Sequence, residues 1–456
     1  MQHFHTFVIG GGPAGKRIAA ALARDGHAVG LAEPNGVGGT CALRGCDPKR
    51  VMVTAADALE RAQRLDGCGL RAGDLRPDWQ QLMARVEELI APKAPDGREE
   101  LEEAGVRFYD AEARFDSDAH VLRVGKNRVR ADRVVIATGQ HPRPLDIPGA
   151  AFAKTSDDFH RLPKVPRRVL FVGGGYIALE SAHVLRRFGA EEVTLVNADE
   201  RALPMTETAL EDRLLAATEQ LGIRYVNCAS VTAIERVEGG FRVCVEAEDG
   251  QTRTRDVDLV MNASGRLPTL DVLDLEGAGI EFDRDSGIAV DEYLRVRGAD
   301  DVYAVGDVAD SQAPPLTPVA TLEADAVLAA LRGEDPVAPR YEGLPTAVYT
   351  LPQLACVGLT EEVARERGHE VEVTERLDAD GQFNAQRVHA RAYGYKTVAD
   401  ASSGKLLGAH LLGPAAAETI NLFALAIRAG LPASIFRDVP WAYPTWASDT
   451  AGMVGK

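Results

Sequence analysis

The sequence contains little cysteine, few aromatic residues and no long apolar run. Six cysteines in 456 residues are too few for a disulfide-rich secreted scaffold. A membrane span needs about 18 consecutive apolar residues, and no stretch of the sequence approaches that length. The opening MQHFHTFVIGGG lacks a signal-peptide pattern. We therefore expect a cytoplasmic, reducing environment and no membrane partner. In that environment, two closely spaced cysteines favour redox, catalytic or metal-binding chemistry over a structural bridge.

Basic residues are fewer than acidic residues. The chain has 51 Lys and Arg against 68 Asp and Glu, a formal net charge of −17, which argues against nucleic-acid binding and against binding to anionic membranes. Hydrophobic residues make up 45% and charged residues 26%, as is typical of globular proteins. At about 150 residues per domain, the length suggests three domains. Glycine, by contrast, is abundant at 44 residues.

Two segments that begin 163 residues apart, at Gly10 and Gly173, repeat one design. Each has the order strand, glycine turn, helix, strand, which predicts a βαβ unit. The expected strands and the residue that ends each unit are Thr6–Ile9, Ala28–Ala32 and Glu33 in the first, and Arg168–Val172, Val193–Val196 and Asn197 in the second.

The first glycine turn fits the pattern G-x-G-x-x-G through Gly10, Gly12 and Gly15. The first glycine permits the tight turn, the second lets backbone amides approach a pyrophosphate, and the third lets the helix pack on the strand. Glu33 follows the second strand, where an acid binds the ribose hydroxyls of a dinucleotide. Strand, helix, spacing and acid agree, so the pattern predicts a dinucleotide site.

The second turn repeats the pattern with Gly173, Gly175 and Ala178, and Asn197 takes the place of the acid. Two dinucleotide sites in one chain indicate a flavin together with a nicotinamide nucleotide. The alternative is a duplicated fold in which only one site binds.

The rest of the chain divides less sharply. Residues 77–104 have helical periodicity, residues 107–133 alternate like antiparallel strands, and residues 134–139 indicate a buried strand before a glycine turn. The prolines of 141–148 indicate a boundary. The segment from about 259 to 266 resembles the end of the second βαβ unit, and residues 301–307 indicate another short strand before a glycine turn. Strands are expected at 371–373, 391–399 and 407–412, and a helix at 418–429, so an α+β domain is predicted from about residue 339 onward.

Cys41 and Cys46 stand five residues apart, just beyond the first βαβ unit. Residues at that spacing do not share one face of a regular helix, so a bridge between them requires a local distortion and is expected to be reducible. A thiolate here would gain from a helix N-terminus and from nearby basic residues. No second pair has zinc-ligand spacing, so no metal site is expected. The other cysteines are interpreted as buried apolar residues: Cys68, Cys228, Cys244 and Cys356.

On these motifs the chain resembles the pyridine nucleotide–disulfide oxidoreductases, such as glutathione reductase, dihydrolipoamide dehydrogenase and mercuric reductase. GGTCALRGCDPKRVM looks like their redox-disulfide segment, VGGGYIALE like the nicotinamide fingerprint and YAVGDV like the second flavin motif, with LTPVA and VGLTEE following in family order. The resemblance implies an α/β fold with two Rossmann-like nucleotide-binding domains and an α+β dimerisation domain. The implied ranges are 1–145 for FAD, 146–266 for NAD(P), 267–338 for a central domain that completes the FAD site, and 339–456 for the dimer interface.

The resemblance also implies roles for individual residues. Cys46 matches the flavin-facing cysteine that forms the charge-transfer thiolate, and Cys41 the interchange cysteine that attacks substrate. Glu180 matches an acid that pairs with a lysine near the flavin; Lys49 is our choice for that lysine, with Arg50 as its competitor. Asp307 matches the acid that binds the flavin ribityl chain, and Tyr176 the side chain that gates the nicotinamide pocket. Further cofactor contacts are predicted at Gly39, Thr40, Thr138, Gly139, Gly265 and Thr317.

The chain departs from the family pattern near its end. The family has His-Pro-Thr, with an acid five residues after the histidine. The histidine serves the partner subunit as acid and base, and the acid orients it. Here Tyr443 replaces the histidine, Ser448 replaces the acid, and Asp449 comes one position late. A tyrosine, with a pKa near about 10, is a poor base at neutral pH. Tyr443 therefore has three interpretations: a proton donor to a leaving thiolate, a sign of an oxidant or metal-ion substrate, or a packing residue beside two tryptophans.

Two other positions depart as well. Asp47 stands where the family has an apolar residue, and its charge disfavours a thiolate on Cys46. Asp325 stands where glutathione reductases carry an arginine for the glutathione carboxylate. This difference argues against glutathione as the substrate.

The choice of nicotinamide nucleotide depends on Asn197. NADH enzymes of the family carry an acid there, whereas NADPH enzymes carry arginines there and six residues later, where this chain has Leu203. Arg201 matches the NADH branch. We therefore expect NADH to be preferred, with NADPH use left open.

Together, the motifs predict a homodimeric, FAD-dependent enzyme that passes electrons from NAD(P)H through Cys41 and Cys46 to a disulfide or related small sulfur compound. One alternative is a reductase of a reactive oxidant, quinone or metal ion. A second alternative is a flavin-based redox sensor.

Overall fold

The computed structural model describes residues 1–116 and 118–455. Backbone contacts group the chain into two compact units. The first unit comprises Met1–Lys49, Ala84–Arg143 and Gly265–Tyr341, and the second Arg50–Met83, Pro144–Ser264 and Glu342–Lys456. Within the described part of the chain, no helix is long and apolar enough to cross a membrane.

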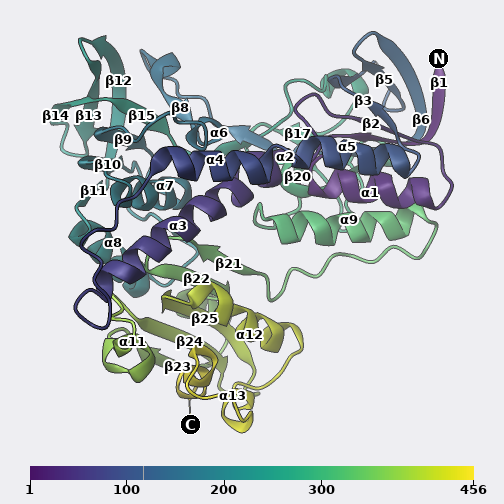
Figure 1. Ribbon diagram of the computed structural model, residues 1–456. Helices are drawn as coiled ribbons and strands as arrows, with labels where there is room; N and C mark the ends of the chain where they lie inside the picture. The colour runs from purple at the N-terminus through teal and green to yellow at the C-terminus, as the bar shows by residue number, and fades with distance from the viewer. Residues whose placement is uncertain (117, 456) are drawn as a thin grey trace. The chain divides into compact units, whose positions relative to one another are not determined.

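The first unit is built on a seven-stranded sheet in the order β3-β2-β1-β6-β5-β4, with β19 paired to β6. Figure 1 labels β1, β2, β3, β5 and β6 of this sheet. Its strands are β1 (Gln2–Ile9), β2 (Val29–Ala32), β3 (Arg107–Tyr109), β4 (Ala113–Phe115), β5 (Val121–Val124), β6 (Asn127–Ile136) and β19 (Val302–Ala304). Strand β1 pairs in parallel with β2 and β6, so the end of the first fingerprint strand lies in the middle of the parallel strands. Nucleotides bind at this edge of such sheets.

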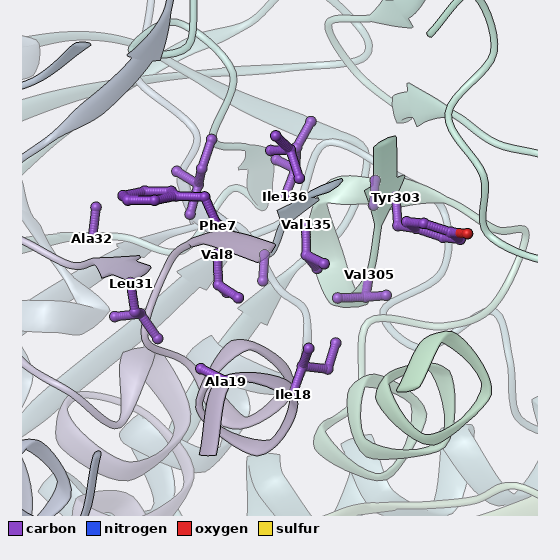
Figure 2. Packing of buried hydrophobic residues seen from close by; sticks show 14 of the residues in the cluster. Phe7, Val8, Ile18, Ala19, Leu31, Ala32, Val135, Ile136, Tyr303 and Val305 are labelled. Atoms are coloured by element: carbon purple, nitrogen blue, oxygen red, sulfur yellow. The ribbon is translucent and has the colours of Figure 1, made fainter. Parts of the chain in front are cut away.

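The core of this unit is apolar on both faces of its central strands. Figure 2 shows Phe7 and Val8 of β1 among buried side chains of β2, β6 and β19. Ile18 and Ala19 come from α1 (Pro13–Arg24), which packs against α9 (Thr317–Leu331). Because Ile18 and Leu22 recur at helical spacing and are fully buried, α1 is held against the sheet with its N-terminus at the glycine turn.

The helical expectation for 77–104 is confirmed, and the antiparallel expectation for 107–133 is confirmed only in part. The helical pattern over 77–104 forms two helices, α4 (Trp79–Ile90) and α5 (Lys93–Glu103), because Pro92 cannot donate the hydrogen bond that a continuous helix needs. The alternating segment is not purely antiparallel: β3 pairs in parallel with β2, and β6 runs on from an antiparallel pairing with β5 into a parallel pairing with β1.

The second unit contains a five-stranded parallel sheet in the order β11-β10-β9-β15-β8. Its elements are β8 (Lys154–Thr155), β9 (Arg168–Val172), α7 (Tyr176–Arg187), β10 (Glu192–Val196), α8 (Thr208–Gln220), β11 (Ile223–Val226) and β15 (Leu259–Asn262). The second βαβ unit is thereby confirmed. An antiparallel sheet of β12 (Ala229–Val237), β13 (Gly240–Ala247) and β14 (Thr252–Val257) shares a buried cluster with it.

The predicted α+β domain is also confirmed within the second unit. An antiparallel sheet has the order β21-β22-β25-β24-β23, and α12 packs against β22 and β25 (Figure 1). The elements are β21 (Pro345–Val348), β22 (Gln353–Gly358), β23 (Val371–Arg376), β24 (Gly394–Asp400), β25 (Leu406–Gly413) and α12 (Ala416–Arg428).

Candidate functional site

The first glycine turn is shaped to receive a bulky anion. Gly10 has φ +107°, and a Cβ there would lie 2.3 Å from the carbonyl oxygen of Ala137; a Cβ on Gly15 would lie 2.0 Å from that of Gly10. Only glycine fits such approaches. Helix α1 begins at Pro13, and its N-cap Gly12 provides no side-chain hydrogen bond, so the first-turn amides are left to bind an external anion.

Glu33 is positioned by this same turn. Its carboxylate accepts hydrogen bonds from the amides of Gly11, at 2.8 Å, and Asn35, at 2.7 Å. These bonds hold the acid beside the glycine turn, where the sequence predicts a ribose contact. The residues therefore fit the adenosine and pyrophosphate parts of FAD.

Cys41 and Cys46 lie on either side of a break between two helices. Cys41 belongs to the short α2 (Gly39–Leu43), and Cys46 is the first residue of α3 (Cys46–Arg64). The interruption at 44–45 is the local distortion that the spacing of the cysteines requires. Both are free thiols, and Cys46 stands at a helix N-terminus, which favours negative charge.

The two sulfur atoms are in contact. The Cys41 thiol donates a hydrogen bond to the Cys46 sulfur, and this bond, followed by burial, raises the pKa of Cys41, while the hydroxyl of Thr317 acts in the opposite direction. Within this pair, Cys41 therefore retains its proton more strongly than an ordinary thiol.

The loop that holds the cysteines contacts the nucleotide turn. A Cβ on Gly39 would lie 2.8 Å from Cα of Gly12, and the amide of Gly38 donates to the carbonyl of Gly11 at 2.8 Å. The redox loop and the first fingerprint are thus joined backbone to backbone. Arg266 reaches the hydroxyl of Thr40 at 3.4 Å, which adds a residue that the sequence analysis did not single out.

Asp307 is held by a buried acid that the sequence analysis also missed. Burial raises the pKa of Asp307, and Arg266 opposes that rise. Glu323 of α9 accepts from the amide of Gly306 at 2.6 Å, from Ser311 at 2.6 Å and from Tyr341 at 2.9 Å. Glu323 therefore fixes the turn that carries Asp307; its apolar helix gave no sequence signal for that role.

The negative charge of Asp47 is partly neutralised, so it opposes a thiolate on Cys46 less than the sequence suggests. Its carboxylate forms an ion pair with Lys93 of α5 at 2.5 Å. The positive charge of Lys93 offsets the unfavourable effect of Asp47 on a neighbouring thiolate. Lys93 is remote in sequence, so this compensation appears only in the fold.

A cavity of about 470 Å³ opens between α1, α5 and α9. Its lining includes Thr321, whose hydroxyl donates to the carbonyl of Thr317 at 3.1 Å, so the cavity lies one helical turn from the residue that contacts Cys41. Its lining residues are Pro13, Lys16, Arg17, Ala20, Ala21, Arg24, Glu100, Thr321, Leu328 and Arg332. Arg17 forms a two-point ion pair with Asp325, one bond of 3.0 Å.

Three further residues that were predicted to contact a cofactor, Thr138, Gly139 and Gly265, lie in the first unit. The Thr138 hydroxyl donates to the carbonyl of Thr269 at 2.8 Å. Gly139 and Gly265 have φ values of +65° and +123°, which favour glycine at both turns.

The second glycine turn repeats the geometry of the first. Gly173 has φ +104°, and a Cβ there would lie 2.2 Å from the carbonyl oxygen of Ala263. Helix α7 begins at Tyr176 after its N-cap Gly175, and the Tyr176 side chain is 43% exposed. Tyr225, which the sequence analysis did not single out, donates to the carbonyl of Gly174 at 3.0 Å.

Asn197 and Arg201 are both used inside the loop after β10. The Asn197 amide donates to the carbonyls of Asp199, at 2.8 Å, and Arg201, at 3.3 Å. Arg201 is paired with Glu211 at 2.8 Å and donates to the carbonyl of Thr206 at 2.7 Å. The guanidinium of Arg201 is therefore held in an ion pair with Glu211.

Glu180 is almost fully buried, at 1% exposure, and accepts the amide of Tyr349 at 2.7 Å. The Arg50 guanidinium lies over the Tyr349 ring, 4.4 Å from its centroid. Lys49 and Glu180 belong to different units, so their pairing stays a prediction.

The C-terminal segment does not rebuild the family's acid–base pair locally. Tyr443 is 79% exposed. Asp449 accepts from Asn384 at 2.8 Å and from Tyr393 at 2.9 Å, so its carboxylate serves its own domain. Ser448 forms a capping box with Thr445.

The interpretation of the other cysteines was largely wrong. Cys68 is exposed and Cys228 and Cys244 are half-buried, because they lie in a turn, a loop and an outer sheet. Only Cys356 of these four is buried, and burial raises the pKa of its thiol to about 12. Among residues 1–116 and 118–455, no cluster of three or more His, Cys, Asp or Glu is arranged to hold a metal ion.

Comparison with known families agrees with this site. Residues 4–324 match the model of the pyridine nucleotide-disulphide oxidoreductases, and residues 344–453 match the dimerisation domain of the same family. The chain belongs to the pyridine nucleotide-disulphide oxidoreductases. By that membership it is an FAD-dependent, NAD(P)H-using disulfide oxidoreductase.

Individual relatives cover nearly the whole chain. It is 31% identical to a glutathione reductase of Nostoc sp., over 99% of both sequences. It is 32% identical to a dihydrolipoyl dehydrogenase of Haloferax volcanii, over 96% of this chain and 93% of the relative. Among solved structures, the Cu(II) complex of the HOCl-induced flavoprotein disulfide reductase RclA from Escherichia coli superposes with a TM-score of 0.88 at 28% identity, over 99% of both chains.

Proposed function

We propose that this protein is a homodimeric reductase that transfers two electrons from NAD(P)H through FAD and the Cys41–Cys46 pair to a small disulfide or related sulfur acceptor. The observation that carries this proposal is the contact between the two thiols at a helix break, on a loop joined to the first nucleotide turn. The balanced reaction consumes one NAD(P)H, one proton and one disulfide, and it releases NAD(P)⁺ and two thiols.

Bound FAD supplies the step that accepts a hydride from NAD(P)H and releases two electrons to a disulfide. The turn at Gly10–Gly15 and the carboxylate of Glu33 would hold its pyrophosphate and adenosine ribose, and Asp307 would hold its ribityl chain. Cys46, at the start of α3, holds the thiolate, and Cys41, which retains its proton more strongly, forms the mixed disulfide once that proton is withdrawn.

The cavity beside α1 and α9 is the proposed site of acceptor binding. Its basic side chains have carboxylate partners: Lys16 pairs with Glu100 at 2.6 Å, and Arg332 with Asp25 at 2.7 Å. Asp325 likewise neutralises Arg17. A carboxylate-bearing acceptor such as glutathione disulfide must compete with these acids, so we propose an acceptor with less negative charge.

NADH is the proposed preferred nucleotide. Support comes from Arg201, which is committed to Glu211 and so is a weak clamp for a 2′-phosphate. A kcat/KM ratio that strongly favours NADPH would contradict this preference. We also propose a cytoplasmic location, where thiols are kept reduced.

The test of the proposed function is anaerobic titration of the holoenzyme with NADH. A two-electron reduced state with a long-wavelength thiolate-to-flavin absorption band is expected, and Cys46→Ser should abolish it. Persistence of the band in this variant would overturn the assignment of Cys46. The matched control is Cys68→Ser, which alters an exposed thiol outside the pair.

A second candidate function is favoured by the C-terminal segment: reduction of an oxidant, a quinone or a metal ion such as Cu(II). Tyr443 is exposed and Asp449 is engaged elsewhere, and the related RclA structures are described as HOCl-induced and as a Cu(II) complex. Rapid turnover with Cu(II), hypochlorous acid or quinones, without activity on glutathione, lipoamide or coenzyme A disulfides, would favour this candidate.

A further inference from the structure

Helix α7 presents three polar side chains to one turn of the C-terminal domain. Residues 349–352, here called the 349–352 turn, join β21 to β22. Tyr349 donates its amide to Glu180 at 2.7 Å, Leu351 donates its amide to Nδ1 of His183 at 3.1 Å, and Arg187 donates to the carbonyl of Leu351 at 2.9 Å. The spacing 180, 183, 187 places these side chains on one helix face.

His183 is built into this contact as a neutral ring. Because Nδ1 accepts from Leu351, Nε2 carries the hydrogen and donates it to the hydroxyl of Thr218 at 3.0 Å. Thr218 in turn donates to the carbonyl of Leu214 at 2.8 Å. Burial lowers the pKa of His183 well below its ordinary value of 6.5, so the ring keeps an acceptor for the 349–352 turn.

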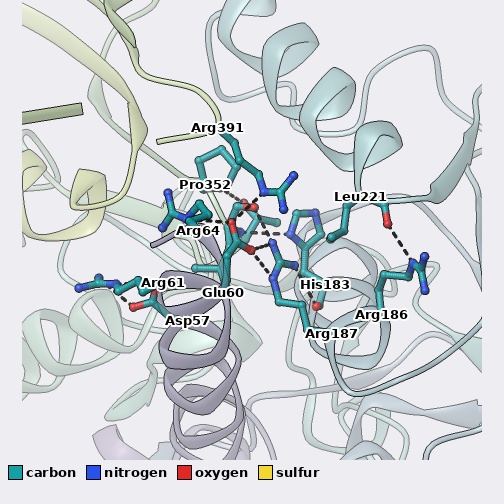
Figure 3. A network of polar contacts seen from close by, with 12 residues as sticks. Asp57, Glu60, Arg61, Arg64, His183, Arg186, Arg187, Leu221, Pro352 and Arg391 are labelled. Carbon is teal, nitrogen blue, oxygen red and sulfur yellow. Dashed lines mark hydrogen bonds and ion pairs between the residues drawn. The ribbon is translucent and has the colours of Figure 1, made fainter. Parts of the chain in front are cut away.

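Arg187 is fixed from the other side by Glu60 of α3. Figure 3 shows Glu60 among Arg187, Arg391 and Arg64. Glu60 is 3% exposed and forms an ion pair with Arg187; its other oxygen lies 3.1 Å from Arg391 and 3.6 Å from Arg64. The carboxylate thus retains two cations if Arg187 is removed, and a variant at Arg187 does not leave a buried charge without compensation.

We propose that Arg187 is a positioning residue for Glu180: held by Glu60, it clamps the 349–352 turn so that the Tyr349 amide fixes the Glu180 carboxylate for reduction of the flavin by NAD(P)H. This inference rests on the proposed function. The physical reason is burial, because at 1% exposure Glu180 has little access to water that could replace a lost donor. Tyr349 and Leu351 lie two residues apart, so a clamp on Leu351 limits the movement of the Tyr349 amide.

The test compares Arg187→Met with Arg186→Met in the holoenzyme. Arg186 is the adjacent arginine on α7, and it donates instead to the carbonyl of Leu221 at 2.9 Å (Figure 3). It also donates to the carbonyl of Ala190 at 2.8 Å. Both changes remove a guanidinium and keep the aliphatic stem. Only Arg187→Met removes a contact to the 349–352 turn.

Three quantities are measured in each variant. Amide hydrogen exchange of peptides that cover 349–351 is expected to quicken about tenfold in Arg187→Met and to stay unchanged in Arg186→Met. The limiting rate of flavin reduction by NADH is expected to fall about tenfold, the size of one lost charge-assisted hydrogen bond. The dissociation constant for NADH should stay within about twofold of the wild type.

Arg187→Lys should keep part of the rate of flavin reduction that Arg187→Met loses, because a lysine can still donate to the carbonyl oxygen of Leu351. Glu60→Gln is the second variant, expected to act in the same direction less strongly if Arg187→Met folds poorly. Equal exchange and equal rates in Arg187→Met and Arg186→Met would overturn the proposal, as would a proportional loss of NADH affinity. A wild-type enzyme whose flavin is not reduced by either nucleotide would instead refute the proposed function.

Discussion

The loop that carries Cys41 and Cys46 and the segment from Tyr443 to Asp449 stand in contrast. The cysteine loop keeps the family pattern, its two thiols are in contact, and its one foreign residue, Asp47, is neutralised by Lys93. The C-terminal segment has a tyrosine in place of the histidine, and the first carboxylate after it, Asp449, is bound to Asn384 and Tyr393 within its own domain.

This contrast separates the two halves of the reaction. In the proposed reaction, the half that takes electrons from NAD(P)H depends on the first region, which retains the family's residues. The half that protonates and releases the reduced acceptor depends in that proposal on the second region, where a tyrosine replaces a base that titrates near neutrality. Electron uptake is therefore expected to be conventional, and electron delivery is expected to differ from that of glutathione reductases.

The largest effect is expected from a substitution in the cysteine loop. Cys41→Ser should lower disulfide reduction by about 10³-fold or more, because the attacking nucleophile is lost, while reduction of the flavin by NADH persists. Stopped-flow spectroscopy beside steady-state turnover separates the two. Equal loss of both reactions would show that Cys41 also serves electron uptake.

Tyr443→His tests the second region directly. If disulfide turnover lacks a base, the variant should gain about ten- to a hundredfold, at the lower end of general acid–base contributions. Tyr443→Phe is the matched control, since it keeps the ring and removes the proton donor. A variant with histidine that gains nothing, beside a phenylalanine variant that loses nothing, would assign Tyr443 to packing or to an acceptor that needs no base.

Acid should weaken the unit that contains the C-terminal segment. Burial lowers the pKa of both His183 and His410 below the ordinary 6.5, so below that pH the unfolded chain binds more protons than the folded one. Stability is present above pH 6.5 and is lost as pH falls, by up to about 1.4 kcal/mol per pH unit for each histidine. Urea unfolding between pH 8 and pH 5 measures this slope, and a His183→Gln variant should reduce it.

The smallest expected effect concerns Lys93. Lys93→Met leaves Asp47 without its counter-charge and should raise, by less than about one pH unit, the pH at which the thiolate-to-flavin band appears, because both side chains are partly exposed and screened by solvent. A spectrophotometric pH titration of the reduced enzyme measures the shift. An unchanged midpoint would mean that Asp47 does not act on Cys46.

Much of the fold was predictable because it rests on local patterns. Both βαβ units follow from glycine spacing and apolar strands, and the α+β domain follows from alternation in its strands. The division of 77–104 into two helices was missed because the break depends on a single proline. The exposure of Cys68 was missed because composition says nothing about which side of a turn faces solvent.

The site was predictable only where chemistry and spacing coincide in the sequence. Cys41, Cys46 and the two glycine turns belong to this group. Glu323, Lys93 and Tyr225 were missed because each acts on a site residue more than 15 positions away, where no periodicity connects them.

By itself, the sequence determined the family, the two nucleotide turns and the cysteine pair, since these depend on short-range backbone geometry that only glycine and closely spaced residues provide. Only the tertiary structure decided which charges are free to act. Three charged residues have partners that the sequence did not predict: Asp47 binds Lys93, Arg201 binds Glu211 and Asp449 binds Tyr393. Glu180 accepts a hydrogen bond from a turn 169 residues away. The reason is physical: the effect of a charge depends on its neighbours within a few ångströms, and those neighbours are set by how the chain folds back on itself.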